Sequence, residues 1–167
     1  MASLLSVAAL QRSTACWAAG ALVDSRNAAG STALISGSQS GKLEAVRSLI
    51  RAGADVNLVS ITQGRSVTAL MLASQLNHPS VVEALLEARA DANFARPESG
   101  YTALMLACVV GNEARVRALL AGGANPRMVA HGECEGHTAL SLAKSKNHPA
   151  IAALLEAKLH ELSAGGV

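Results

Sequence analysis

Hydrophobic residues recur along the chain in four similar blocks, and each block begins with Thr-Ala-Leu. The leading residues are Thr32, Thr68, Thr102 and Thr138, so the blocks follow one another at intervals of 36, 34 and 36 residues. The spacing within a block is constant, and the loops between blocks absorb the difference in length. A fixed block joined by loops of slightly variable length predicts a stack of repeated structural units.

Each block predicts two short antiparallel helices. In the first block, Leu34 belongs to one apolar run, and Leu43, Val46, Leu49 and Ile50 form a second run at helical spacing. Residues that tolerate a left-handed backbone separate the two runs in every block, namely Gly41, Asn77, Gly111 and Asn147. Helices this short are marginal in isolation, so the stack must supply their stability.

The ends of the second helices are also marked. Gly53 and Gly123 are expected to end the first and third of them, and Arg89 stands at the equivalent position, where a positive φ is expected. Leu159 replaces this glycine in the last block, so that helix is expected to continue through Glu161. Residues 163–167 are interpreted as a frayed tail.

These motifs carry a family resemblance. Thr-Ala-Leu begins every block, glycine stands two residues earlier at positions 30, 100 and 136, and Gly-Ala-Asp-Val-Asn occupies positions 53–57. In these features the chain resembles the ankyrin repeat family. The resemblance implies an all-α solenoid of stacked helix–turn–helix pairs with β-turn or hairpin fingers. The family's Thr-Pro-Leu-His has alanine in place of proline here, and its histidine is replaced by Ile35, Met71, Met105 or Ser141.

The register divides the chain into five units of one domain. Residues 27–62, 63–96 and 97–132 are expected to be full repeats, and residues 133–167 a C-terminal capping repeat. Residues 1–26 are interpreted as a degenerate N-terminal capping repeat, because the segment ending at Asp24 lies in register with the segment ending at Asn57. The alternative is an organelle transit peptide, since no acidic residue precedes Asp24.

Composition narrows the classes of partner. The chain has 14 Lys and Arg against 12 Asp and Glu. This near balance lacks the excess of positive charge that is typical of proteins that bind nucleic acid or a membrane surface. No apolar run approaches the ~20 residues of a membrane-spanning helix, so direct membrane insertion is not expected. Charged residues make up 16% of the chain, below the roughly 25% of typical domains, which indicates a surface partly covered by a partner. The three scattered cysteines favour an intracellular, cytoplasmic location, and an organelle is the alternative.

Candidate chemistry is sparse, and neither an enzyme nor a bound cofactor is predicted. His131, Cys134 and His137 lie in one loop, but a structural zinc site needs a fourth ligand, so metal binding is the weaker interpretation. The recurring threonines are expected to cap helices rather than act as nucleophiles. Asn57 and Asn93 are positions of the kind that asparaginyl hydroxylases modify in ankyrin-type proteins, although a side chain bonded to the loop backbone is the favoured interpretation.

The remaining candidate is a protein-binding surface made of finger tips and the exposed side of the first helices. Phe94 and Tyr101 bracket one finger with Arg96 between them, and aromatic and Arg side chains are common interface anchors. The alternative is that Phe94 only packs its own loop. A non-catalytic module that binds another protein is therefore predicted, and a permanently bound subunit of a larger assembly is the alternative. The residues assigned to the predicted surface are Arg65, Val67, Gln75, Leu76, Phe94, Arg96, Glu98, Tyr101, Val109, Val110, His137, Ser145 and Lys146.

Overall fold

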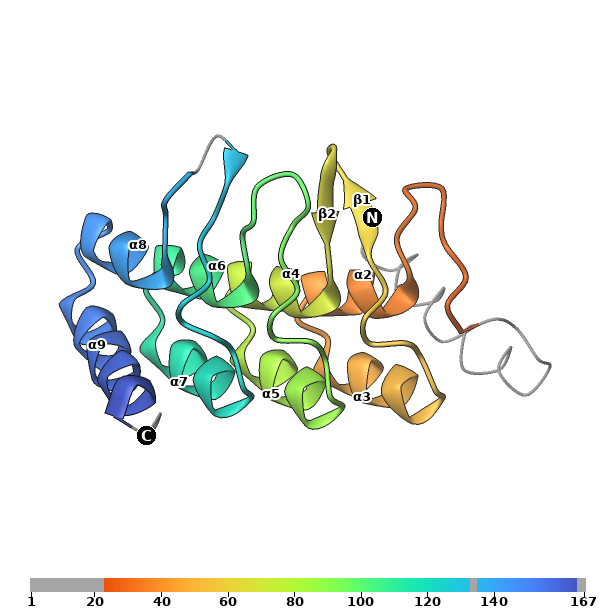
Figure 1. Cartoon of the computed structure of the whole chain (residues 1–167). Coiled ribbons are helices and arrows are strands. Elements are labelled where there is room, and N and C mark those ends of the chain that lie inside the picture. The colour runs from red at the N-terminus through yellow and green to blue at the C-terminus, as the bar shows by residue number, and fades with distance from the viewer. Residues whose placement is uncertain (1–22, 133–134, 165–167) are drawn as a thin grey trace.

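Helices arranged in two rows make up most of the computed structural model, which describes residues 23–132 and 135–164 (Figure 1). The inner row consists of α2 (Ala33–Gln39), α4 (Ala69–Gln75), α6 (Ala103–Val110) and α8 (Ala139–Ser145). The outer row consists of α3 (Leu43–Arg51), α5 (Pro79–Glu87), α7 (Glu113–Ala121) and α9 (Pro149–Ala164). Each inner helix packs against the outer helix that follows it and against the next inner helix. The predicted all-α solenoid is confirmed.

Loops that rise beside the inner row form four fingers (Figure 1). We define them as residues 26–32, 58–67, 94–101 and 128–138, of which 133–134 lie outside the described residues. The second finger is an antiparallel hairpin of β1 (Ser60–Thr62) and β2 (Arg65–Val67). Its turn residues, Gln63 and Gly64, have φ values of 52° and 73°, as a tight hairpin turn requires.

The leading threonine of every block caps an inner helix, as predicted. The hydroxyl oxygens of Thr32, Thr68 and Thr102 each accept a hydrogen bond of 3.3 Å from the backbone N–H three residues later. At Thr138 the corresponding bond is 3.1 Å, and the Ser141 hydroxyl accepts from the Thr138 N–H in return. The side chains at the family's histidine position, Ile35, Met71 and Met105, are buried, so apolar packing replaces that polar contact.

Side-chain amides and carboxylates link successive repeats. Asn57 Oδ1 accepts from the Asp91 N–H at 2.7 Å, and Asn93 Oδ1 accepts from the Asn125 N–H at 2.7 Å. Both asparagines therefore bond loop backbone, as the favoured interpretation expected, but the loop belongs to the following repeat. Asp24 accepts in the same way from the Asp55 N–H at 3.2 Å, which extends the register one unit towards the N-terminus. The predicted capping repeat itself, with the exception of residues 23–26, lies outside the described residues.

Histidine and glycine alternate at the turns between the inner and outer helices. The His78 ring packs where a Cβ on Gly41 would lie, and the His148 ring packs in the same way against Gly111. Asn77 and Asn147 adopt φ values of 65° and 59° at the equivalent position, as predicted. Each histidine ring thus occupies the space that a side chain on the glycine of the preceding helix pair would need.

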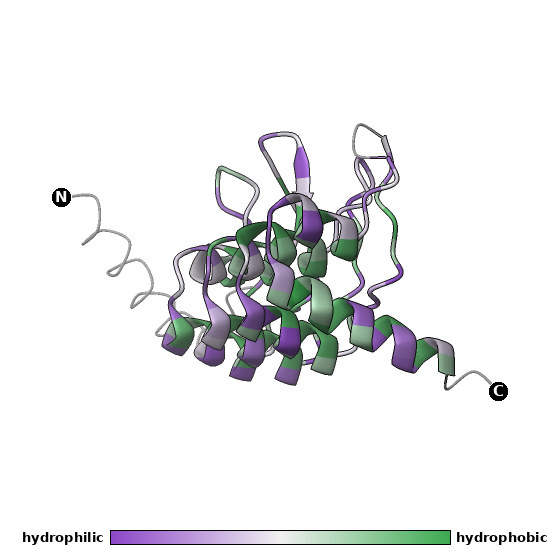
Figure 2. Cartoon of the chain, turned by 90° about the vertical axis from the view of Figure 1, so that its left-hand side faces the viewer, coloured by the Kyte–Doolittle hydropathy of each residue, from purple (hydrophilic) through white to green (hydrophobic). Residues whose placement is uncertain are grey.

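The last helix is longer than the other outer helices. It spans Pro149–Ala164, so the expected continuation past Leu159 is confirmed. The tail prediction is wrong for residues 163 and 164: both are helical, and the Ser163 hydroxyl donates to the His160 carbonyl at 2.8 Å. Hydropathy colouring shows a mostly hydrophobic inner row, whereas the outer row alternates between hydrophobic and hydrophilic positions (Figure 2). Of the outer helices, α3 and α5 are clearly amphipathic, with one face in the core.

Candidate partner-binding surface

Large hydrophobic side chains exposed among the described residues gather on the fingers and at the ends of inner helices. They are Ile61 (70% exposed), Leu76 (42%), Val110 (41%), Val129 (55%) and Leu162 (43%). Ile61 and Val129 lie on the second and fourth fingers. Leu76 follows α4 and Val110 ends α6. Only Leu162, on α9, belongs to the outer row.

The ends of α4 and α6 bring four predicted contact residues together. Gln75 and Leu76 are exposed at the end of α4, Val110 is exposed at the end of α6, and Val109 is half-buried beside it. Leu76 and Val110 occupy the same position relative to the leading threonine of their blocks. Because α4 and α6 pack directly against each other, these positions are neighbours on the surface.

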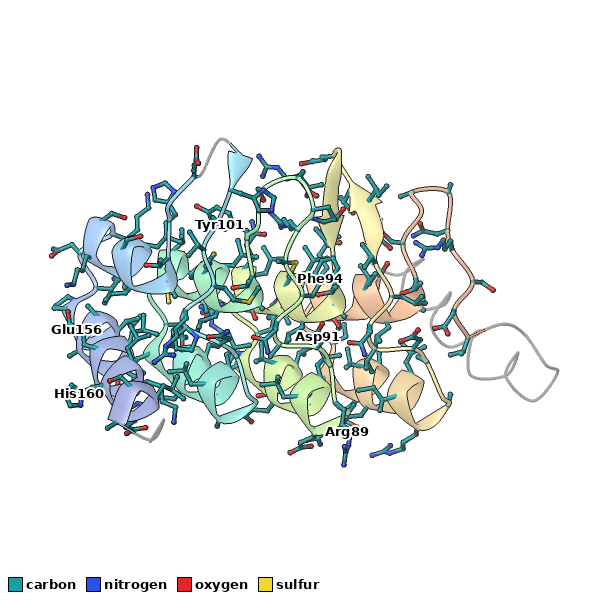
Figure 3. All side chains as sticks on the ribbon, viewed as in Figure 1. Arg89, Asp91, Phe94, Tyr101, Glu156 and His160 are labelled. Atoms are coloured by element: carbon teal, nitrogen blue, oxygen red, sulfur yellow. The ribbon has the colours of Figure 1, made fainter. Side chains whose placement is uncertain are left out.

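The aromatic residues of the third finger face inward, as the alternative interpretation of Phe94 expected. Phe94 and Tyr101 are half-buried and pack against the core, at the two ends of the finger that connects α5 to α6 (Figure 3). The Arg96 N–H donates to the Tyr101 carbonyl at 3.0 Å and closes the finger. The packing of Phe94 and Tyr101 against the core therefore helps to hold the third finger in place.

Arg96 and Glu98 connect this finger to its neighbours. Arg96 is 7% exposed, and burial lowers the pKa of its guanidinium, with Arg65 adding to the effect and Glu98 opposing it. Arg96 therefore supports the finger rather than presenting a free cation. Glu98 Oε1 accepts from the Ser66 N–H at 2.7 Å. Although burial acts to raise the pKa of Glu98, hydrogen bonds and the nearby Arg96 outweigh it and lower that pKa.

Other predicted contacts divide between exposed and buried positions. Arg65, His137, Ser145 and Lys146 are exposed. The placement of Val67 on the accessible surface is wrong: it is buried because it lies at the base of the hairpin, opposite Ser60, and its side chain enters the core. Sequence alternation alone did not reveal which face of this two-stranded finger is covered.

The candidate metal loop is only partly described. Cys134 lies outside the described residues, while His131 and His137 are exposed on the fourth finger. Within residues 23–132 and 135–164, no group of three or more His, Cys, Asp or Glu side chains is arranged to hold a metal ion. The His131 N–H donates to the Ser99 carbonyl at 3.0 Å, so the described part of this loop is tied to the third finger.

The sequence of the chain matches a model of a known protein family. A family model described as ankyrin repeats (3 copies) matches residues 2–94 and 70–163, which together cover most of the chain. The chain belongs to the ankyrin-repeat family. A search of curated proteins finds no match. Ankyrin repeats are generally protein–protein interaction modules and typically non-catalytic. No helix in the described part of this ankyrin-repeat chain is long and apolar enough to cross a membrane.

One unusual residue inside the ankyrin stack was not predicted from the sequence. Arg115, on α7, is completely buried, and its Nη1 donates to the Ser74 carbonyl near the end of α4. Its Nε and Nη2, and the Ser74 hydroxyl, have no hydrogen-bond partner among the described residues. Burial lowers the pKa of the Arg115 guanidinium. The available signal was its register, because Val81 and Ile151 stand at the same position of neighbouring ankyrin repeats.

Cys108 is expected to be unreactive in the folded ankyrin stack. It is fully buried in α6, and burial raises the pKa of its thiol to about 12, so the nucleophilic thiolate is scarce at neutral pH. In a Cys16→Ser/Cys134→Ser background, labelling by a disulfide reagent at pH 8 should proceed only as fast as the protein opens, and at least 100-fold faster in denaturant. Equal rates with and without denaturant would contradict this burial.

Proposed function

We propose that this chain is a non-catalytic module that binds another protein through the surface formed by its fingers and inner helices. The observation that carries the proposal is the distribution of exposed hydrophobic side chains. Four of the five large ones in the described part of the chain, Ile61, Leu76, Val110 and Val129, lie on fingers or at inner-helix ends. Leu76 and Val110 end two helices that pack against each other, and neighbouring exposed apolar side chains commonly mark an interface.

The pair at the ends of α4 and α6 is placed to supply binding energy. Leu76 and Val110 are each about two-fifths exposed, 42% and 41%, on adjacent helices. Complete burial of such a side chain contributes roughly 1.5–3 kcal/mol, so covering the part still exposed would contribute about 1 kcal/mol for each. Gln75 and Val109 border the pair, which gives a mixed polar and apolar patch of the kind found at interfaces.

Hydrogen bonds between adjacent fingers support a preordered surface. Arg26 Nη2 donates to the Val59 carbonyl at 2.9 Å and joins the first finger to the second. The Ser66 to Glu98 bond of 2.7 Å joins the second to the third, and the His131 to Ser99 bond of 3.0 Å joins the third to the fourth. Fingers held in this way lose little conformational entropy on binding, which favours affinity.

Substitution of the central pair tests the proposal. In the Leu76→Asp/Val110→Asp variant, partners recovered with the wild-type chain from native cells should fall at least tenfold, because two charges replace the apolar contact. Quantitative mass spectrometry of affinity-purified samples provides the measurement. The matched control is Leu162→Asp, since Leu162 is similarly exposed, at 43%, but lies on α9 in the outer row.

The control also defines the contrary result. Equal loss of the same partners from Leu162→Asp and from the double variant would place the binding surface elsewhere. Unchanged recovery in both variants, with folding verified by circular dichroism, would do the same.

A further inference from the structure

The four turns between inner and outer helices form a continuous row along one edge of the stack. They comprise residues 39–42, 75–78, 109–112 and 145–148. Neighbouring turns touch one another: His78 Nε2 lies 3.2 Å from the Gln39 carbonyl oxygen, and Asn112 Nδ2 donates to Asn77 Oδ1 at 2.8 Å. The His148 ring packs against Gly111 and continues the row to the last turn.

The row combines an apolar centre with cationic ends. Leu76 and Val110 stand in the two middle turns, whereas Lys42 and Lys146 stand in the first and last. Both lysines are exposed. None of the sixteen residues in the four turns is Asp or Glu. The acids that follow the first and third turns, Glu44 and Glu113, face Arg47 and Arg117 on their own helices. A surface of this pattern is complementary to an apolar segment with negative charge at its two ends.

The two lysines have no internal counter-ion. In the part of the chain that the structure describes, no carboxylate lies within ion-pair distance of Lys42 or Lys146. The nearest acids in sequence are engaged elsewhere: Glu44 faces Arg47 at 3.8 Å and Glu156 pairs with Lys144 at 2.7 Å. Both ammonium groups are therefore free to interact with a partner.

We propose that the bound partner presents a segment with a hydrophobic centre flanked by acidic side chains, which runs along this row of turns. The inference rests on the proposed function and adds the chemistry of the segment. The central side chains cover Leu76 and Val110, and a carboxylate on either side pairs with Lys42 or Lys146. Because these pairs form at the edge of the contact, they contribute mainly to selectivity and to the rate of association, and salt weakens them.

The length of the row limits the spacing of the acids. Adjacent packed helices lie roughly 8–10 Å apart, so three intervals between the first and the fourth turn span about 24–30 Å. An extended chain advances at most ~3.3–3.6 Å per residue. The acidic side chains are therefore expected about eight residues apart in an extended segment, with the apolar side chains between them.

A display experiment tests this chemistry directly. Random 16-residue peptides displayed on phage are selected against the purified full-length chain, and the recovered peptides are synthesised with a fluorescent label. The expected peptides contain an apolar centre with Asp or Glu on both sides. Their dissociation constants are measured by fluorescence anisotropy. The constants should be at least tenfold higher for Lys42→Glu/Lys146→Glu than for the wild type. For the wild type, they should also rise at least tenfold when NaCl is raised from 50 to 500 mM. The Lys42→Arg/Lys146→Arg variant keeps the charge and should bind within twofold of the wild type.

The outcomes separate this inference from the proposed function. Peptides that need Leu76 and Val110 but are indifferent to lysine reversal and to salt would overturn the acidic chemistry and leave the binding surface intact. Peptides indifferent to Leu76→Asp/Val110→Asp as well would overturn both. Concentration-dependent dimerisation in sedimentation, abolished by Leu76→Asp, would assign the row to a second copy of this chain and overturn the acidic segment.

Discussion

Replacement of Arg115 by methionine is expected to raise the free energy of unfolding by about 1–2 kcal/mol. The guanidinium is fully buried, and two of its nitrogens, Nε and Nη2, have no partner among the described residues. Removing a charge from water costs several kcal/mol unless counter-charges and hydrogen bonds repay it, and replacing buried ionic groups with apolar side chains of similar volume is often stabilising by ~1–4 kcal/mol. The lowered pKa of Arg115 has the same origin, since desolvation is its cause.

The bond that would be lost has a substitute nearby. Arg115 Nη1 donates to the Ser74 carbonyl, one of the unpaired carbonyls at the end of α4. In the fourth helix pair, the equivalent carbonyl of Lys144 accepts from the Asn147 N–H at 3.1 Å. Asn77 has the same left-handed conformation as Asn147, with φ values of 65° and 59°. Its N–H is therefore placed to bond Ser74 once the arginine is gone.

Urea denaturation followed by circular dichroism measures the change. The matched control is Val81→Arg, which puts arginine at the same position of the neighbouring repeat and should destabilise the fold by about 3 kcal/mol or more, since Val81 is buried and no counter-ion is provided. A loss of more than 1 kcal/mol in Arg115→Met would mean that the Ser74 bond outweighs the desolvation cost. In that case Arg115 stabilises the junction between the second and third repeats.

The regular parts of the fold were predictable because the same sequence pattern occurs in each repeat. Thr32 and its equivalents cap helices, Arg89 has the expected positive φ of 64°, and the last helix continues past Leu159. These features depend on local backbone chemistry, which a few residues determine. Arg115 was missed for the opposite reason. A charged side chain is normally expected to be exposed to solvent, and only comparison with the equivalent, buried Val81 predicts that Arg115 is buried.

The fingers were less predictable than the helices. Leu76 was expected to be exposed, and it is, because its position between two helices fixes its surroundings. Val67 and Arg96 are buried instead. Finger packing depends on contacts between loops roughly 30 residues apart, such as Ser66 to Glu98, and no periodicity along the chain reports such contacts. The partner-binding role of these residues stays a proposal.

Substitution of Gly111 by alanine is expected to lower the free energy of unfolding by about 3 kcal/mol. Gly111 has a φ of 83°, and a left-handed conformation costs a residue with a side chain roughly 1–2 kcal/mol. A Cβ at this position would also lie 2.3 Å from Cε1 of His148. The imidazole would have to move, and inserting one carbon into a packed site costs a further ~1–3 kcal/mol.

A second glycine separates backbone strain from the clash. Gly123 has a similar φ of 88°, but a Cβ there would meet nothing within 4 Å. Gly123→Ala should therefore cost only the strain, about 1–2 kcal/mol. Combining Gly111→Ala with His148→Ala should give a total cost at least 1 kcal/mol below the sum of the single costs, because truncating the ring removes the conflict.

This double-mutant cycle of Gly111→Ala and His148→Ala tests whether the alternation of glycine and histidine holds the repeats in register. Urea denaturation of the single and double variants supplies the four free energies that it needs. Additive costs would mean that the His148 ring turns aside freely and that the contact is incidental. Non-additive costs would make glycine in one turn a requirement for histidine in the next. Gly41 and His78 then face the same constraint, since a Cβ on Gly41 would lie 2.4 Å from Nδ1 of His78.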